Sequence, residues 1–167
     1  TAVDPVSVYA VDVDGDGDID VLSASQLDDQ IAWYENDGSE NFTAHAITLY
    51  AQTSSTADKP REVYAIDMDG DGDMDVLSAS ENDNKVAWHE NDGNENFAQR
   101  VISTTTANGP KQVFATDLDG DGDIDVLSAS PKDDKIAWYE NDGNENFTAH
   151  IITTAANETQ SVYAVDL

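Results

Sequence analysis

Short apolar runs and turn-forming residues alternate along the whole chain. In the first unit the runs are rich in Val, Ile, Tyr, Trp, Phe and Thr, and Gly, Asn and Asp separate them. Such runs predict β-strands, and no stretch shows the 3.6-residue periodicity of an amphipathic helix over a useful length. The pattern predicts an all-β protein, whose first strands are expected at 8–13, 20–25, 31–35 and 42–48.

The pattern repeats. The segment VYAVDVDGDGDIDVLSAS at 8–25 returns with few changes at 63–80 and at 113–130. The aspartate at position 12 therefore has equivalents 55, 50 and 49 residues further along at each step, the last of them Asp166. Four antiparallel strands about every 50 residues are typical of β-propeller blades. Separate small domains are the alternative, but about 50 residues rarely bury enough surface to fold alone.

These repeats predict the organisation of the chain. We expect one all-β domain over 1–167, a propeller or half-propeller. It contains three four-stranded antiparallel blades plus the first strand of a fourth unit. The blades are expected at about 6–50, 62–104 and 112–154, and the extra strand at 161–167.

Three blades are too few to close a ring around a central channel. An open arc would expose the apolar faces of its end blades, which favours association. Two arrangements stay open: the chain is part of a longer repeat array, or two copies form a homodimer that completes a six-bladed ring. In the second case the strand at 161–167 would close the junction.

Charge limits the partners. The chain carries 35 acidic and 7 basic residues, a net charge of -28. Nucleic acids and anionic membrane surfaces are excluded as partners because both would be repelled. No apolar run approaches the roughly 18 residues of a membrane span, so we expect no membrane insertion. With no cysteine and no signal peptide at its start, the chain is either cytosolic or a mature part of an exported protein, and we expect the second, secreted or on the cell surface.

Five aspartates stand at alternate positions in each copy of the loop D-x-D-G-D-G-D-x-D. Calcium prefers six to eight oxygen ligands, and alternate spacing in a tight loop directs successive side chains toward one centre. Positions 1, 3, 5 and 9 are expected to supply carboxylates and position 7 its backbone carbonyl, with about three calcium ions per chain. The candidate ligands are Asp12, Asp14, Asp16, Asp18 and Asp20; Asp67, Asp69, Asp71, Asp73 and Asp75; and Asp117, Asp119, Asp121, Asp123 and Asp125.

A solvated turn, magnesium, zinc and an EF-hand fit the loop less well than calcium. Mutual repulsion of five aspartates would destabilise a solvated turn, magnesium keeps more of its waters, and zinc would require His or Cys. The first six positions match an EF-hand loop, but an EF-hand needs glutamate at position 12, where this chain has Ser23, Ser78 and Ser128. The flanking segments also have the pattern of strands.

The loop between a VYAVDV strand and a DVLSAS strand resembles the FG-GAP or VCBS repeat. Integrin α-subunit propellers, a fungal propeller lectin and many exported bacterial proteins carry such repeats. The resemblance covers about 8–153 and implies a calcium-stabilised β-propeller with ligands at the positions named above. Propellers of this family generally have six to eight blades, whereas this chain offers three.

Recurring aromatic residues and histidines add less. Trp33, Trp88 and Trp138 recur in AWYEND or AWHEND. They could form sugar platforms, but their fixed place in a strand favours packing between blades. His45 and His150 are equivalent, and Gln99 is assigned to their position in the second unit, so no histidine metal site is expected.

The function that follows is a calcium-binding propeller module for extracellular adhesion or recognition, with a glycan as a candidate ligand and calcium in a structural role. The residues that would bind this ligand are not identified. The alternatives are a non-binding scaffold and a fragment of a propeller-based polysaccharide-active enzyme. We expect no enzyme, because G-x-S-x-G, a Cys–His pair and a phosphate-binding loop are absent from the sequence.

Overall fold

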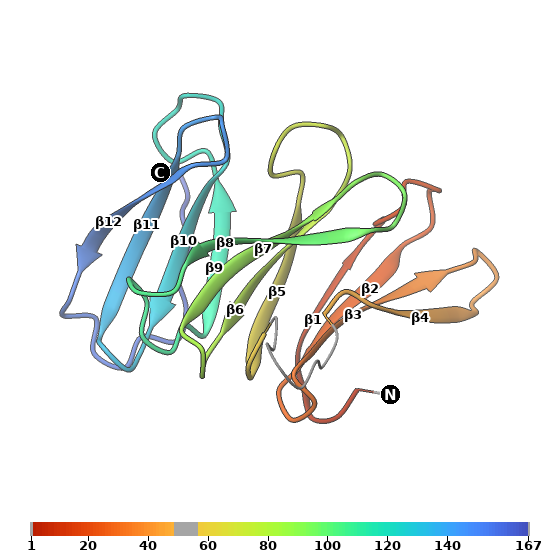
Figure 1. The fold of residues 1–167 in the computed structure, drawn as a ribbon, viewed down its shortest axis with the longest axis horizontal. Helices are drawn as coiled ribbons and strands as arrows, with labels where there is room; N and C mark the ends of the chain where they lie inside the picture. Colours follow the sequence, from red (N-terminus) through yellow and green to blue (C-terminus); the bar gives the residue numbers. More distant parts are fainter. Residues whose placement is uncertain (1, 49–56, 167) are drawn as a thin grey trace.

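A computed structural model describes residues 2–48 and 57–166, which form three antiparallel sheets of four strands each (Figure 1). In each sheet the strands are neighbours in chain order, as expected for propeller blades. None of the described residues forms a helix that could cross a membrane. The first sheet contains β1 (Pro5–Val11), β2 (Asp20–Ser25), β3 (Gln30–Asn36) and β4 (Phe42–Ala46).

The second and third sheets repeat the first. Together the observed strands confirm the predicted all-β class and the four-stranded unit. The second sheet contains β5 (Pro60–Ile66), β6 (Asp75–Ser80), β7 (Lys85–Asn91) and β8 (Phe97–Ser103). The third contains β9 (Gln112–Thr116), β10 (Asp125–Ser130), β11 (Lys135–Asn141) and β12 (Phe147–Thr153). Residues 49 and 50 of the expected first blade lie outside the described residues.

Strand ends differ from the prediction where side chains or bulges intervene. β1 begins at Pro5 rather than residue 8, because pairing with β2 continues through an irregularity to Pro5↔Ser25. β4 ends at Ala46 rather than residue 48, because the next two amides both donate to the carbonyl of Ile31, at 3.0 and 3.1 Å. Residues 161–166 have no strand assignment, since no neighbouring strand pairs with them among the described residues.

The apolar core lies at the two joints between sheets. At the first joint Leu22, Ile31 and Trp33 pack in one cluster with Val63 and Val76 of the second sheet. The second joint repeats this arrangement with the equivalent residues of the second and third sheets, including Trp88. Each fully buried aliphatic side chain contributes about 1.5–3 kcal/mol. The prediction that the tryptophans pack between blades is confirmed for Trp33 and Trp88.

The three sheets form an open arc with the chain termini at opposite ends (Figure 1). Equivalent residues therefore differ in exposure: Val8 is 70% exposed, whereas Val63 and Val113 are 1% and 2% exposed. Their sequence context is almost the same, so the difference arises because a preceding sheet covers Val63 and Val113 but not Val8.

The two rims of the arc carry different connections. Each acidic loop (12–20, 67–75 and 117–125) joins the first and second strands of a sheet, so all three lie on one rim, at the top of Figure 1. The turns between second and third strands lie on the opposite rim, because adjacent strands are antiparallel. The fold thus gathers the three aspartate clusters along one edge.

Candidate metal centres

Position 1 of each acidic loop organises the turn. In the first loop Asp12 Oδ1 accepts the amide of Gly15 at 2.8 Å and Oδ2 accepts the amide of Gly17 at 3.0 Å. Both glycines have positive φ, 76° and 98°, a conformation that glycine adopts without steric cost. Asp67 and Asp117 make the same pair of hydrogen bonds in their loops.

Position 9 joins the loop to the next hairpin. Asp20 is fully buried, with Oδ2 accepting the amide of Val13 at 2.9 Å and Oδ1 accepting the amide of Asn36 at 2.8 Å. Asp75 and Asp125 are held in the same way by the amides of Asn91 and Asn141. These bonds orient the carboxylate, and each oxygen retains a second lone pair for a cation.

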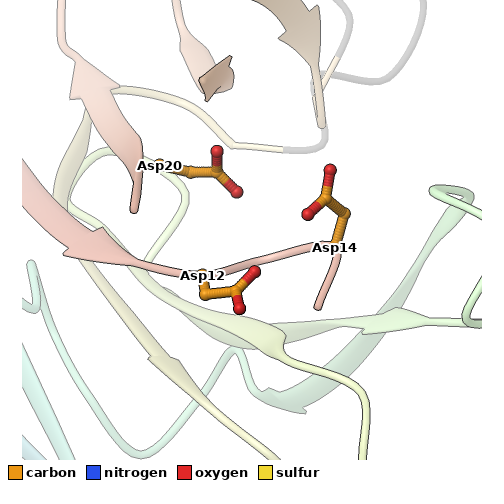
Figure 2. Close-up of side chains that lie close together, drawn as sticks. All are labelled: Asp12, Asp14 and Asp20. Atoms are coloured by element: carbon orange, nitrogen blue, oxygen red, sulfur yellow. The ribbon is translucent and has the colours of Figure 1, made fainter. Parts of the chain in front are cut away.

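The carboxylates converge in every loop. Figure 2 shows Asp12, Asp14 and Asp20 around a common space. Their ligand atoms lie within 4.8 Å of one another, as do those of equivalent sets in the other loops. Such a set of hard oxygen donors fits calcium. The other sets are Asp67, Asp69 and Asp71, and Asp117, Asp119 and Asp125.

The structure places the remaining candidate ligands differently. Positions 1 and 3 belong to all three sets, position 9 to the first and third, and position 5 to the second. Asp16, Asp121 and Asp75 therefore lie outside the converging sets. The position-7 side chains point elsewhere: Asp18, Asp73 and Asp123 lie against Gly38, Gly93 and Gly143, where a Cβ would collide with the carboxylate. The backbone carbonyl stays the predicted position-7 ligand.

Burial and mutual repulsion disfavour the ionised form of carboxyl groups in the acidic loops. Burial raises the pKa of Asp14, and repulsion from Asp16, Asp20 and Asp12 adds to it, although the amide of Asp16 acts in the opposite direction. Burial raises the pKa of Asp75 to about 7, against the hydrogen bonds from the amides of Asn91 and Met68. A divalent cation would reverse both shifts, because it stabilises the ionised carboxylate.

The sequence analysis did not identify the asparagines that hydrogen-bond to the position-9 aspartates, although a repeated motif marks them. Asn36, Asn91 and Asn141 each precede an Asp-Gly pair in the repeated ENDG. The side-chain oxygen of Asn36 accepts the amide of Gly38 at 3.2 Å, and its Nδ2 donates to the carbonyl of Ile19 at 3.1 Å. This asparagine therefore connects the turn between β3 and β4 to the acidic loop.

A cleft lies beside the acidic loop at the second joint. It has a volume of about 460 Å³, whereas the equivalent space at the first joint has about 50 Å³. Small-molecule sites in proteins usually have about 300–1,000 Å³, so the space beside Trp88 has room for a ligand and the equivalent space beside Trp33 does not. Its lining combines aromatic rings with polar groups, among them Asp69, Trp88, Asn141, Asn144, Glu145 and Phe147.

A basic residue pairs with glutamate next to each of the three tryptophans. His45 stacks on Trp33 with ring centroids 4.5 Å apart and bonds to Glu35 at 2.8 Å; His150 repeats this with Trp138. In the second sheet the residue opposite Trp88 is Arg100, so the assignment of Gln99 to this position was wrong. Arg100 follows Phe97 by three residues, as His45 follows Phe42, so the predicted equivalent was one residue too early.

Comparison with known proteins agrees with this architecture. A model of the FG-GAP-like repeat matches residues 12–78, 67–128 and 117–167. No significant match was found among curated proteins.

Among solved structures, an Agrocybe aegerita lectin described as recognising non-reducing terminal N-acetylglucosamine has a TM-score of 0.58 at 18% identity. The match covers 88% of this chain and 39% of the lectin chain, so this chain spans well under half of the lectin's length. At this identity the likeness concerns the fold alone. Because the repeat model covers most of the sequence, the chain belongs to the family of FG-GAP-like repeats.

Proposed function

We propose that the chain is a calcium-binding β-propeller module that serves recognition or adhesion outside the cell. The observation that carries this proposal is the convergence of aspartate carboxylates in three equivalent loops. The position-1, -3, -5 and -9 carboxylates and the position-7 carbonyl would hold one ion in each loop. The bound ion supplies positive charge, and the loop's own residues join the first strand of each sheet to the second.

Calcium in this proposal is structural, and no catalytic step is assigned to the acidic loops. Extracellular modules bind calcium with dissociation constants of about 10⁻⁴–10⁻³ M, so loops of modest affinity would be occupied in an extracellular setting. The excess of acidic residues that repels nucleic acids attracts calcium to the same rim.

Calorimetric titration of the chelator-treated chain tests the metal sites. We expect about three calcium ions per chain, one for each loop. The combined variant Asp14→Asn, Asp69→Asn and Asp119→Asn should keep its strand content by circular dichroism but lose calcium binding, because each loop loses a converging carboxylate. Binding of equal stoichiometry to this variant would refute the assignment.

The candidate ligand is a glycan, and the cleft at the second joint supports this choice. Phe147 offers aromatic surface there, and Asn144 and Glu145 offer hydrogen-bonding groups. The lectin with a similar fold is described as recognising terminal N-acetylglucosamine. N-acetylglucosamine is therefore the first sugar to test.

A glycan array followed by calorimetry tests this part separately. Asn144→Ala should weaken binding of a sugar that occupies the cleft. Asn94→Ala is the matched control, because Asn94 makes the same turn hydrogen bonds in the second sheet without lining the larger cleft. Equal effects of the two substitutions would contradict the cleft as the site. Absence of binding to any glycan would favour the non-binding scaffold.

A further inference from the structure

The six residues SVYAVD occur twice, at 7–12 and at 161–166. In the first copy, Ser7 to Val11 lie in β1 and pair with β2, from Ser7↔Ala24 to Val11↔Asp20. The second copy has no paired strand among the described residues. Identical residues are therefore found once inside a sheet and once beside one.

The second copy already occupies the place of a first strand. Aromatic rings of the first strands form a row, with Tyr9–Tyr64 centroids 5.0 Å apart and Tyr64–Phe114 centroids 5.8 Å apart. Tyr163 extends this row, 4.6 Å from Phe114. The segment 161–166 thus lies next to β9 as β9 lies next to β5.

Hydrogen bonds repeat the same relation. The amide of Val162 donates to Gln112 Oε1 at 2.5 Å, as the amide of Val63 donates to Ser7 Oγ at 3.4 Å. The amide of Glu158, just before the segment, donates to Asp134 Oδ1 at 3.0 Å. At the first joint the amide of Lys59 donates in the same way to Asp29 Oδ1 at 2.9 Å.

The edge of 161–166 that would face a second strand is open. Backbone amides of an extended segment alternate in direction. Since the amide of Val162 points toward β9, those of Tyr163 and Val165 point toward the open edge. Their side chains are 70% and 64% exposed. An unpaired edge of this kind is a template for another strand.

The complementary surface lies at the other end of the arc. Val8 on β1 is exposed where its equivalents are buried, because no preceding sheet covers the first sheet. On the third sheet Leu118 is 38% exposed, whereas its equivalents Val13 and Met68 are each 3% exposed. Both ends thus present half of a joint that the molecule builds twice internally.

We propose that residues 161–166 of one copy pair with β2 of a second copy, in place of that copy's β1, so that the chains join head to tail. The register follows from the existing pairs: Tyr163 opposite Leu22 and Ala164 opposite Val21. The incoming strand has the same side chains as the one it replaces, so contacts with β2 are conserved. The β1 strand that is replaced leaves the sheet of the second copy.

Simple docking of the two end faces is the alternative to exchange. β1 of a second copy would need the place next to β9 that 161–166 already occupies. Two strands cannot share it, so one must leave: the segment 161–166 if the end faces dock, and β1 of the second copy in the proposed exchange. The new joint would then cover Leu118 as the internal joints cover Val13 and Met68.

Sedimentation of the full chain at increasing concentration tests the proposal. We expect the mass to rise from the 18.0 kDa of one chain to at least twice that value. Val165→Pro should abolish this rise, because proline has no amide hydrogen for the pairing edge. Val165→Ala keeps the amide and should associate normally. A chain that stays monomeric at all concentrations, or association that survives Val165→Pro, overturns the proposal.

Disulfide trapping tests the register. The chain has no cysteine, so Ala164→Cys combined with Val21→Cys adds only two thiols. Oxidation should give covalent multimers on a non-reducing gel. Ala164→Cys with Leu22→Cys is the control, since a shift of one residue directs the side chain to the other face. Equal cross-linking of both variants, or of neither, contradicts the exchange. Parallel runs in calcium and in chelator separate this result from calcium binding.

Discussion

Asp75 and Glu81 are buried carboxylates at opposite ends of β6, 1% and 9% exposed. Burial raises the pKa of Asp75 to about 7. Burial acts in the same direction on Glu81, but Lys59 and Lys132 outweigh it and hold the pKa of Glu81 below its usual value. Their Nζ atoms lie 2.9 and 3.3 Å from the Glu81 carboxylate oxygens. The two sites differ because lysine side chains lie next to Glu81 and no basic side chain pairs with Asp75 among the described residues.

The same contrast extends to the two rims. The acidic loops contain no basic residue. At the opposite rim Lys85 and Lys135 also pair with aspartates, at 2.9 and 2.8 Å. One rim therefore carries its own counter-charge, and the loops of the other rim contain carboxylates without basic residues among them. Six of the seven basic residues lie at or next to the opposite rim: Lys59, Arg61, Lys85, Lys111, Lys132 and Lys135.

Removal of calcium should have the largest effect, because it acts on all three loops together. At a calcium concentration of 100 times the dissociation constant, each occupied loop adds about 2.7 kcal/mol to the free energy of unfolding. Thermal unfolding with calcium and with excess chelator measures the sum as a change in Tm. If the Tm values coincide, the acidic rim does not depend on a bound ion.

His89 tests how burial shifts the pKa of a side chain inside the second sheet. Burial lowers the pKa of this side chain to about 4, and the charge of Lys85 acts in the same direction. The unfolded chain thus takes up the proton first, and stability falls between pH 6.5 and 4 by as much as roughly 3 kcal/mol.

The repeats supply the control for His89. Tyr139 occupies the equivalent position, is 1% exposed and lies 3.2 Å from Ser128 Oγ, as His89 Nε2 does from Ser78 Oγ. His89→Tyr should therefore remove this part of the acid sensitivity. Urea unfolding of both chains at pH 7 and pH 5 measures it, and a difference between the chains that is independent of pH would contradict the burial argument.

Asp69→Asn should affect a single loop, with opposite signs in the two conditions. With calcium the variant should lose about 2.7 kcal/mol, the contribution of one site. In chelator its Tm should equal or slightly exceed that of the parent, because repulsion from Asp71 and Asp67 contributes to the raised pKa of Asp69. Calorimetric unfolding in both buffers measures the change of sign. A loss of equal size in both would show that the carboxylate acts without an ion.

Glu81→Gln should have a smaller effect that calcium does not change. The substitution removes the charge that pairs with Lys59 and Lys132. Hydrogen bonds to charged groups contribute about 1.5–3 kcal/mol, so a loss of about 2 kcal/mol is expected. Chemical denaturation in calcium and in chelator should give the same loss, and a calcium-dependent loss would mean that the rims are coupled.

Much of the candidate site could be predicted because its geometry is local. Asp12 and its partners Gly15 and Gly17 lie within six residues, so their types and spacing largely specify the turn. The role of Asn91 could not be predicted in this way, because it meets Asp75 only after β7 has paired with β6. The selection of ligands is also tertiary: position 9 belongs to the converging set in two loops but not in the second.

The cleft and the open edge illustrate the same limit. Trp33 and Trp88 stand in nearly identical sequences, yet the space beside Trp88 is much the larger. That volume depends on how the turn of the following sheet lies against the preceding loop. No periodicity within one unit carries this information.

The order of residues alone specifies three four-stranded units and three acidic loops, because strand pairing and turn chemistry act over short distances along the chain. It does not specify which copy of a residue is buried. Val8 and Val63 share their neighbours in sequence and differ in exposure because a preceding sheet covers only one of them. Burial, cleft volume and the open edge at 161–166 are properties of the surfaces that meet, and those surfaces exist only after the sheets have packed.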